Sequence, residues 1–245
     1  MPGYHLWVAL HGLLGAIALL TFWSAAFLKK GSPRHRAIGK VFLLSMAGIV
    51  LTGVPLVIEF AFFRHTMAIA LFLTFLLPLT AQACWTAWRA VTDKADWRAL
   101  VARPGWKLAQ VLPALLALPV LWVGLRQREA LFAGFALIPL YTAWTMHRFA
   151  KRGPEQRNWH VVMHYQAMLG AGIATHVAFL TIGMRPVWDW LATHTAVPRT
   201  LIELFPWFAP VAVAVVAGAR LGRTWNRKGV TPVKPAVSVR PSVCE

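Results

Sequence analysis

Charged residues, acidic residues and cysteine are all scarce in this chain of 245 residues. Only 13% of the residues are charged, whereas a soluble globular protein carries roughly 25%. The eight Asp and Glu residues leave few candidates for a carboxylate general base, which disfavours a hydrolase. The two cysteines, Cys84 and Cys244, provide no disulfide framework, and we interpret both as free thiols.

Motifs that would identify a reaction are missing as well. No Cys-x-x-Cys-His motif is present, which excludes a covalently attached c-type haem. The chain has no Gly-rich phosphate loop, no zinc-protease motif and no recognisable Ser-His-Asp or Cys-His arrangement. The sequence therefore assigns no catalytic residue, and it leaves open whether the protein is an enzyme.

Apolar sequence is what the chain has in abundance. Hydrophobic residues make up 58% of it, and 13 residues are tryptophan, which is enriched at membrane interfaces. The basic residues lie in short loops between apolar runs, so we attribute the formal net charge of +17 to membrane topology and expect no nucleic-acid partner. This composition predicts an all-α, polytopic transmembrane helical bundle in contact with the lipid bilayer.

Seven apolar runs are long enough to cross a bilayer, which takes about 20 residues of helix. The predicted spans are residues 5–28, 41–63, 67–90, 107–126, 130–149, 159–183 and 201–222. They define a seven-helix membrane domain over residues 1–223, followed by a tail over residues 224–245 that we predict to be disordered. Residues 184–200, between the last two spans, are expected to include a short interfacial helix.

The distribution of positive charge predicts the orientation of the bundle. Twenty of the 25 Lys and Arg residues fall on the side that holds the C-terminus. Because positively charged loops stay in the cytoplasm, we expect the N-terminus outside and the C-terminus in the cytoplasm. No positive charge precedes the first apolar run, so we expect no cleaved signal peptide.

Several prolines fall inside the predicted spans. A proline removes one helical N–H donor, so each of them frees a carbonyl that must find a partner in a neighbouring helix or in water. These prolines are Pro55, Pro78, Pro113, Pro119, Pro139, Pro206 and Pro210.

Two histidines, His11 and His176, lie about 10 Å inside the outer edges of the first and sixth spans. Imidazoles inside a span are costly and rare, so they suggest a function. At one depth on two helices, they would clamp a b-type haem or another transition metal. Glu59 and Glu203, near the same level, also suit a zinc site or a proton path. The alternative is that all four groups hydrogen-bond within the bundle or face a hydrated vestibule.

A second histidine group lies on the inner side of the predicted bundle. His160 and His164 are one helical turn apart on one face, a spacing that chelates metals. His35 and His147, at the inner ends of neighbouring spans, are placed to join them. The alternative is that these are interfacial imidazoles that meet phosphates, water and loop carbonyls.

The basic loop ahead of the second span has features of its own. Gly31 and Pro33 predict a turn, and Ser32 is placed to cap the helix that follows. We expect Arg34 and Arg36, near that helix start, to contact an anionic lipid headgroup on the cytoplasmic face. The alternative is a loop that only sets topology.

Three pieces of sequence carry a resemblance to a known family. They are His11-Gly12 with Gly15, then Lys30-Gly31 with His35-Arg36, Gly39 and Met46, and finally His164 with Met168-Leu169-Gly170 and Ala178-Phe179. In this order the chain, from residue 5 to about residue 183, resembles the bacterial membrane proteins designated domain of unknown function 2306. The resemblance implies a multi-pass protein of the bacterial inner membrane and brings no reaction, cofactor or substrate. His176 stands where the family usually has an apolar residue. This difference makes His11, His35 and His164 the stronger candidates for a site that the family shares.

Three functions follow from these patterns as hypotheses. The first is a redox- or metal-linked membrane protein whose buried histidines bind haem b or a transition metal. The alternatives are a proton- or solute-coupled transporter, and a non-catalytic membrane sensor or assembly factor with a basic docking face. Convergent, unpaired imidazoles in the structure would favour the first function, whereas fully hydrogen-bonded polar groups would favour the third.

Overall fold

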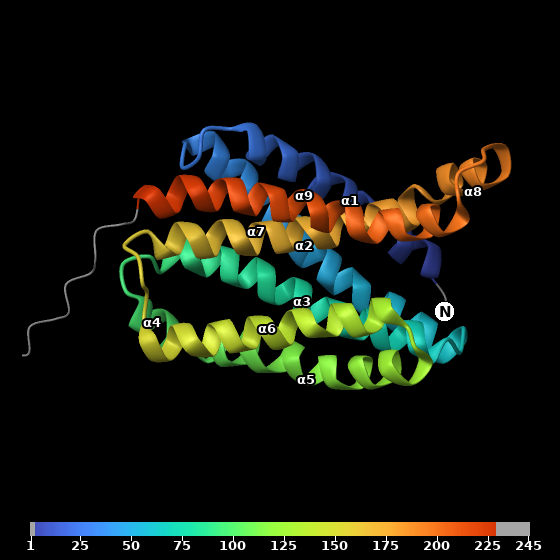
Figure 1. The fold of residues 1–245 in the computed structure, drawn as a ribbon, viewed down its shortest axis with the longest axis horizontal. Helices are drawn as coiled ribbons and strands as arrows, with labels where there is room; N and C mark the ends of the chain where they lie inside the picture. Colours follow the sequence, from blue (N-terminus) through green and yellow to red (C-terminus); the bar gives the residue numbers. More distant parts are fainter. Residues whose placement is uncertain (1–2, 229–245) are drawn as a thin grey trace, which may run out of the picture.

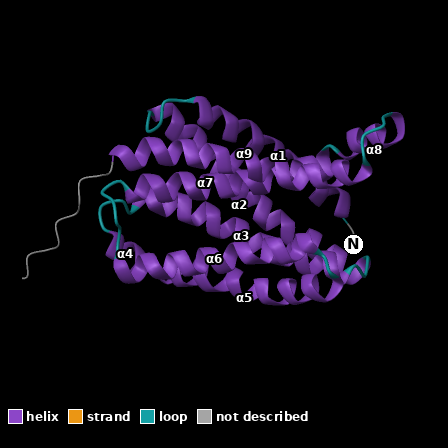
Figure 2. Cartoon of the chain, in the orientation of Figure 1, coloured by secondary structure: helices purple, strands orange, loops and turns teal. Residues whose placement is uncertain are grey.

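The computed structural model describes residues 3–228, and this part of the chain is helical, without a β-strand (Figure 2). Seven of its helices are long and apolar enough to cross a membrane, which confirms the predicted seven-span, all-α fold. They are α1 (Tyr4–Phe27), α2 (Pro33–Ile58) continuing as η1 (Glu59–Phe63), α3 (Met67–Thr92), α5 (Pro104–Gln127), α6 (Ala130–Arg152), α7 (Trp159–Ala178) continuing as η2 (Phe179–Gly183), and α9 (Arg199–Lys228). Two short helices, α4 (Trp97–Ala102) and α8 (Arg185–His194), lie in the connections.

The helix limits agree with the predicted spans to within three residues, except at the start of the second span and at the end of the seventh. α2 begins at Pro33 rather than at residue 41, because local signals start the helix before the apolar run begins. The Ser32 hydroxyl accepts a hydrogen bond from the backbone N–H of His35 (3.2 Å), and Pro33 occupies the first turn. Arg34 and Arg36 of the predicted loop therefore lie on α2.

The C-terminal region follows the sequence prediction in part. A short helix, α8, forms within residues 184–200, and its placement at a membrane interface stays a prediction. α9 continues to Lys228, past the predicted end of the membrane domain at residue 223. The rest of the predicted tail, residues 229–245, lies outside the described residues.

α3 is the central helix of the bundle. It packs against α2, α5 and α7, while α1 pairs mainly with α2, α6 with α5 and α9 with α7 (Figure 1). One apolar cluster joins α3, α5 and α6 around Phe75 and Val120. Another joins α1, α2 and α7 around Phe42 and Ala171. α3 therefore connects two helix groups that have separate apolar cores.

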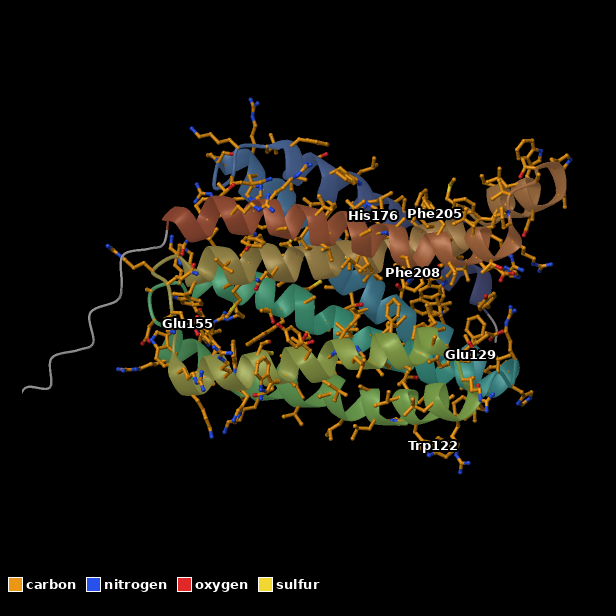
Figure 3. The ribbon with its side chains drawn as sticks, in the orientation of Figure 1. Trp122, Glu129, Glu155, His176, Phe205 and Phe208 are labelled. Atoms are coloured by element: carbon orange, nitrogen blue, oxygen red, sulfur yellow. The ribbon has the colours of Figure 1, made fainter. Side chains whose placement is uncertain are left out.

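The outward faces of the helices are apolar. Trp122 on α5 is 60% exposed, and Phe205 and Phe208 on α9 are 46% and 58% exposed (Figure 3). A soluble monomer rarely exposes so much contiguous apolar surface, whereas a bilayer covers it. Together with the length of the seven helices, this surface makes the chain a multi-pass membrane protein.

The connections between helices gather at two ends of the bundle (Figure 1). The N-terminus, α8 and the α2–α3 and α5–α6 connections lie at one end. The α1–α2, α3–α5 and α6–α7 connections lie at the other end, together with the end of α9. Because most Lys and Arg residues fall there, we call it the basic end. Its cytoplasmic location remains the prediction made from the charge pattern.

Gln82 shows how the bundle satisfies a carbonyl that a proline has freed. Pro113 has no N–H to donate to the carbonyl of Ala109 one turn earlier in α5. Gln82 on α3 is only 4% exposed, and its Nε2 donates to the Ala109 carbonyl at 2.7 Å. The predicted pairing of freed carbonyls with a neighbouring helix is confirmed at this proline.

Replacing Gln82 by Met keeps most of the side-chain volume but removes the donor to Ala109. We expect the free energy of unfolding to fall by about 1 kcal/mol, the scale of interhelical hydrogen bonds in membranes. In a Pro113→Ala background the helix supplies its own N–H, so the same replacement should cost less. Reversible unfolding of the four proteins in bicelles measures this difference. An equal cost in both backgrounds would contradict the assignment.

The orientation of the bundle can be tested with two matched alanine-to-cysteine variants. Ala102 lies at the basic end and Ala196 at the opposite end, and both are exposed. In a background with Cys84 and Cys244 replaced by Ser, a membrane-impermeant maleimide added to spheroplasts should label Ala196→Cys only. Ala102→Cys should react after permeabilisation, because positive loops stay in the cytoplasm. The reverse pattern would show that the orientation is wrong.

Candidate functional site

His11 on α1 makes a hydrogen bond inside the α1–α2 hairpin. Its Nδ1 lies 2.9 Å from the hydroxyl oxygen of Thr52 on α2. That hydroxyl donates its own proton to the carbonyl of Gly48 (2.8 Å), so it accepts from His11. His11 therefore has a protein partner of its own and ties α1 to α2.

His176 on α7 uses both of its ring nitrogens. Its Nδ1 lies 2.7 Å from the carbonyl of Gly172, and because a carbonyl only accepts, Nδ1 carries the proton. The indole N–H of Trp23 on α1 donates to Nε2 at 2.8 Å. The ring of Phe22 packs edge-on against the same imidazole, with 5.4 Å between ring centroids. His176 is thus a satisfied neutral imidazole that has no free lone pair for a metal.

The structure does not bring His11 and His176 together. His176 meets Trp23, which lies about three turns from His11 on α1, or roughly 18 Å along the helix axis. Figure 3 places His176 near the middle of the bundle rather than at one end. The outer haem or metal site predicted from this histidine pair is therefore not formed by the two rings.

The two carboxylates of the predicted outer site are both paired with arginine. Glu59, buried in η1, lies 3.6 Å from Nε of Arg64, whose guanidinium covers the ring of Tyr4. Glu203 lies on the surface at the start of α9, with Nε of Arg199 at 2.9 Å. Within residues 3–228, no three His, Cys, Asp or Glu side chains are placed to hold one metal ion. The predicted zinc-type set is therefore not assembled.

His35 and His164, at the basic end, are arranged differently. Nδ1 of His164 donates to the carbonyl of Ala87 on α3 (2.8 Å), and Nδ1 of His35 donates to the carbonyl of Ala25 on α1 (3.1 Å). Each bond places the proton on Nδ1 and leaves a lone pair on Nε2. No residue that the structure describes hydrogen-bonds to either Nε2. The two rings lie within Coulombic range of each other.

The helix faces explain why these two rings reach one region. Two turns beyond His35 on the same face of α2 is Phe42, and two turns beyond His164 on α7 is Ala171. Phe42 and Ala171 belong to one buried apolar cluster, so α2 and α7 turn these faces toward each other. The apolar period of both helices thus places the two histidines at the basic end of a shared core.

Two more basic groups, Lys30 and His160, lie near the two rings, and Lys94 lies near His160. Lys30 donates from Nζ to the same carbonyl as His35 (3.0 Å), and it lies within Coulombic range of His164. His160, one turn before His164, is in range of Lys94 in the α3–α4 connection. Nδ1 of His160 is buried and has no hydrogen-bond partner in the described part of the chain. We call this group the inner basic cluster: Lys30, His35, Lys94, His160 and His164.

Carboxylates at the basic end are engaged outside the inner basic cluster. Asp93 binds both Arg89 and Arg103, the latter at 2.8 Å from its Nε, and Glu155 pairs with an arginine of α6 at 3.2 Å. A third carboxylate, in the α3–α4 connection, caps α4. Desolvation meanwhile lowers the pKa of Lys30 from its ordinary value. The cluster is therefore a partly desolvated positive region, which favours an anionic partner.

The other predicted residues lie around the inner basic cluster rather than in it. Arg34 and Arg36 are exposed on the first turn of α2, and their contact with anionic headgroups stays a prediction. His147 is exposed on α6, which packs mainly against α5, and not on the helices that carry the cluster. The predicted inner metal site thus reduces to His35 and His164, with His160 beside them.

Sequence reasoning missed three side chains that shape these sites. Trp23 was not recognised as the partner of His176, because the crossing of α1 over α7 has no signature in either helix. Lys30 and Lys94 were read only as topology signals. The position of Lys30 just after the last turn of α1, where a basic side chain can bind the final carbonyls, was a usable signal for its role.

Comparison with known protein families, with curated proteins and with solved structures found no match. The resemblance to the family designated domain of unknown function 2306 therefore stays a prediction. The fold defines the class of this protein as a multi-pass membrane protein, and the inner basic cluster lies at one end of its bundle. Its function has to be argued from that site.

Replacing Trp23 by Phe keeps an aromatic ring beside His176 but removes the N–H donor. We expect a loss of about 1 kcal/mol in the free energy of unfolding, because Nε2 of His176 then lacks its partner. In a His176→Leu background the replacement should cost clearly less, and unfolding in bicelles measures both values. Additive costs would show that the hydrogen bond contributes nothing to stability.

Proposed function

We propose that this protein is a redox- or metal-linked membrane protein that binds a transition metal or haem iron through His35 and His164. The observation that carries the proposal is the pair of rings whose Nδ1 donates to a carbonyl and whose Nε2 has no partner among residues 3–228. Histidines that ligate metals almost always donate their other ring N–H to a carbonyl, a carboxylate or water. This bond fixes the tautomer and the ring orientation before the metal arrives.

The same argument separates the functional histidines from the structural ones. His176 is also anchored to a carbonyl, but its Nε2 is occupied by Trp23. His11 bonds a hydroxyl that already donates elsewhere in α2. His11 therefore keeps a lone pair on Nε2, but within the described residues no second histidine is found beside it, and His176 has no lone pair left. The proposal therefore moves the ligand site from the outer half, where the sequence placed it first, to the basic end.

The alternative functions draw less support from the site. A proton- or solute-coupled transporter would use Glu59 and Glu203, but both are ion-paired with arginine and Glu203 lies on the surface. A non-catalytic sensor or assembly factor is favoured by the ring of His176, which has a partner at both nitrogens. We place the protein in the bacterial inner membrane with its basic end at the cytoplasmic face, where Arg34 would meet anionic headgroups.

The test is an absorbance spectrum and a metal analysis of protein purified from membranes of cells supplied with iron and haem precursor. We expect bound haem or close to one metal per chain. His164→Ala and His35→Ala should each lower the bound amount at least about tenfold, because each removes a ligand rather than an outer contact.

His147→Ala is the matched control for this test, because it removes an exposed imidazole at the same end of the bundle. We expect this variant to keep the wild-type content of haem or metal. Wild-type protein without haem absorbance and without stoichiometric metal would refute the proposed function. Equal content in the wild type, in His164→Ala and in His35→Ala would refute it as well.

A further inference from the structure

The charges around His35 and His164 restrict the kind of metal that these rings accept. Nζ of Lys30 lies 3.0 Å from the Ala25 carbonyl, to which Nδ1 of His35 also donates, so Lys30 lies beside the His35 ring. Its charge also acts on His164, and the charge of Lys94 acts on the neighbouring His160. The carboxylates of the basic end that the structure describes are held by arginines or by a helix cap. A bare Zn²⁺ ion would therefore meet ammonium groups instead of the anionic ligands that complete its coordination sphere.

A simple anion fits the inner basic cluster no better. The N–H groups of His35 and His164 already donate to main-chain carbonyls, so each ring offers only the lone pair of Nε2. A lone pair repels the oxygen of a phosphate or a lipid headgroup unless the ring takes up a second proton. Lys30 and Lys94 thus favour a negative group, whereas the two imidazoles favour an electron-pair acceptor.

The change from apolar to charged residues along the bundle also indicates what kind of ligand fits the inner basic cluster. The apolar cluster around Phe42 and Ala171 lies two turns inward from His35 and His164, so it borders the rings on the bilayer side. Lys30 and Lys94 lie in connections at the basic end, and both are exposed. A matching ligand has an apolar body, a metal at its centre and negative charge at its water-facing rim.

We infer that the ligand is a b-type haem whose iron is held by Nε2 of His35 and His164 and whose propionates pair with Lys30 and Lys94. This inference rests on the proposed function and selects haem from the transition-metal ligands. Nδ1 of His160, near Lys94, is buried and has no partner among the described residues, so a propionate bound at Lys94 would supply the partner that it lacks. The iron supplies the electron-pair acceptor, and the two carboxylates supply the negative charge that the cluster lacks.

The experiment compares three probes on haem-depleted, full-length protein in detergent: ferric haem, its dimethyl ester and Zn²⁺. The ester keeps the iron and the apolar ring but lacks both carboxylates. We expect haem to bind with the shifted Soret band of histidine ligation and His164→Ala to abolish that shift. The double variant Lys30→Gln, Lys94→Gln should weaken haem binding about tenfold and leave ester binding unchanged.

Two variants serve as controls for this titration. Lys151→Gln removes an exposed charge at the same end, on α6, and should change neither affinity. His164→Met keeps a group that can ligate iron, so a displaced Soret band would separate direct ligation from a folding defect. Size-exclusion elution in detergent must be the same for all variants.

The outcomes separate the inference from the proposed function. Zn²⁺ binding that is lost in His164→Ala, without haem binding, would overturn the inference and leave the proposed function standing. So would equal affinity for haem and its ester with no effect of the lysine replacements, provided that His164→Ala still removes the Soret shift. Binding of anionic-lipid vesicles alone, binding that ignores His164→Ala, or no binding at all would overturn both.

Discussion

A polar group enclosed by a bilayer must find its partner within the protein, and this bundle depends on that constraint. Pro113 leaves the carbonyl of Ala109 without a donor, and Gln82 reaches across from α3 to supply one. The ring of His176 is saturated in the same way by Gly172 and Trp23. These contacts join helices that lipid-facing apolar residues alone would not hold in register, because lipid and leucine are equally apolar.

Because most polar groups in the bundle have a hydrogen-bond partner, ring nitrogens without one at the basic end indicate a binding site. At the basic end, Nδ1 of His35 and Nδ1 of His164 each donate to a main-chain carbonyl. The Nε2 atoms of both rings have no partner among the described residues. Lys30 and Lys94 lie nearby, while the carboxylates of that end are engaged by arginines or a helix cap. A positively charged region that offers two imidazole lone pairs suits a ligand that has both an electron-pair acceptor, such as a metal ion, and an anionic group.

The seven spans could be predicted because consecutive residues determine the length and the apolarity of a membrane helix. α2 starts earlier than predicted because the Ser32 cap and Pro33 act locally and do not depend on hydropathy. The predicted approach of His11 to His176 is not found, and the reason is geometric. Counting depth from the membrane edge assumes that helices stand upright and side by side, whereas the contact of α1 with His176 is made by Trp23 and not by His11.

The sequence by itself determined the class of protein, the number of spans, most of their limits and the gathering of positive charge at one end. Each of these is set by residues close together in the chain. Only the tertiary structure decided which histidines are structural and which are open. That distinction depends on whether a second helix brings a donor, such as the Trp23 indole, to the remaining ring nitrogen. The way in which helices cross decides which residues meet, and residues that are far apart in the chain determine that crossing.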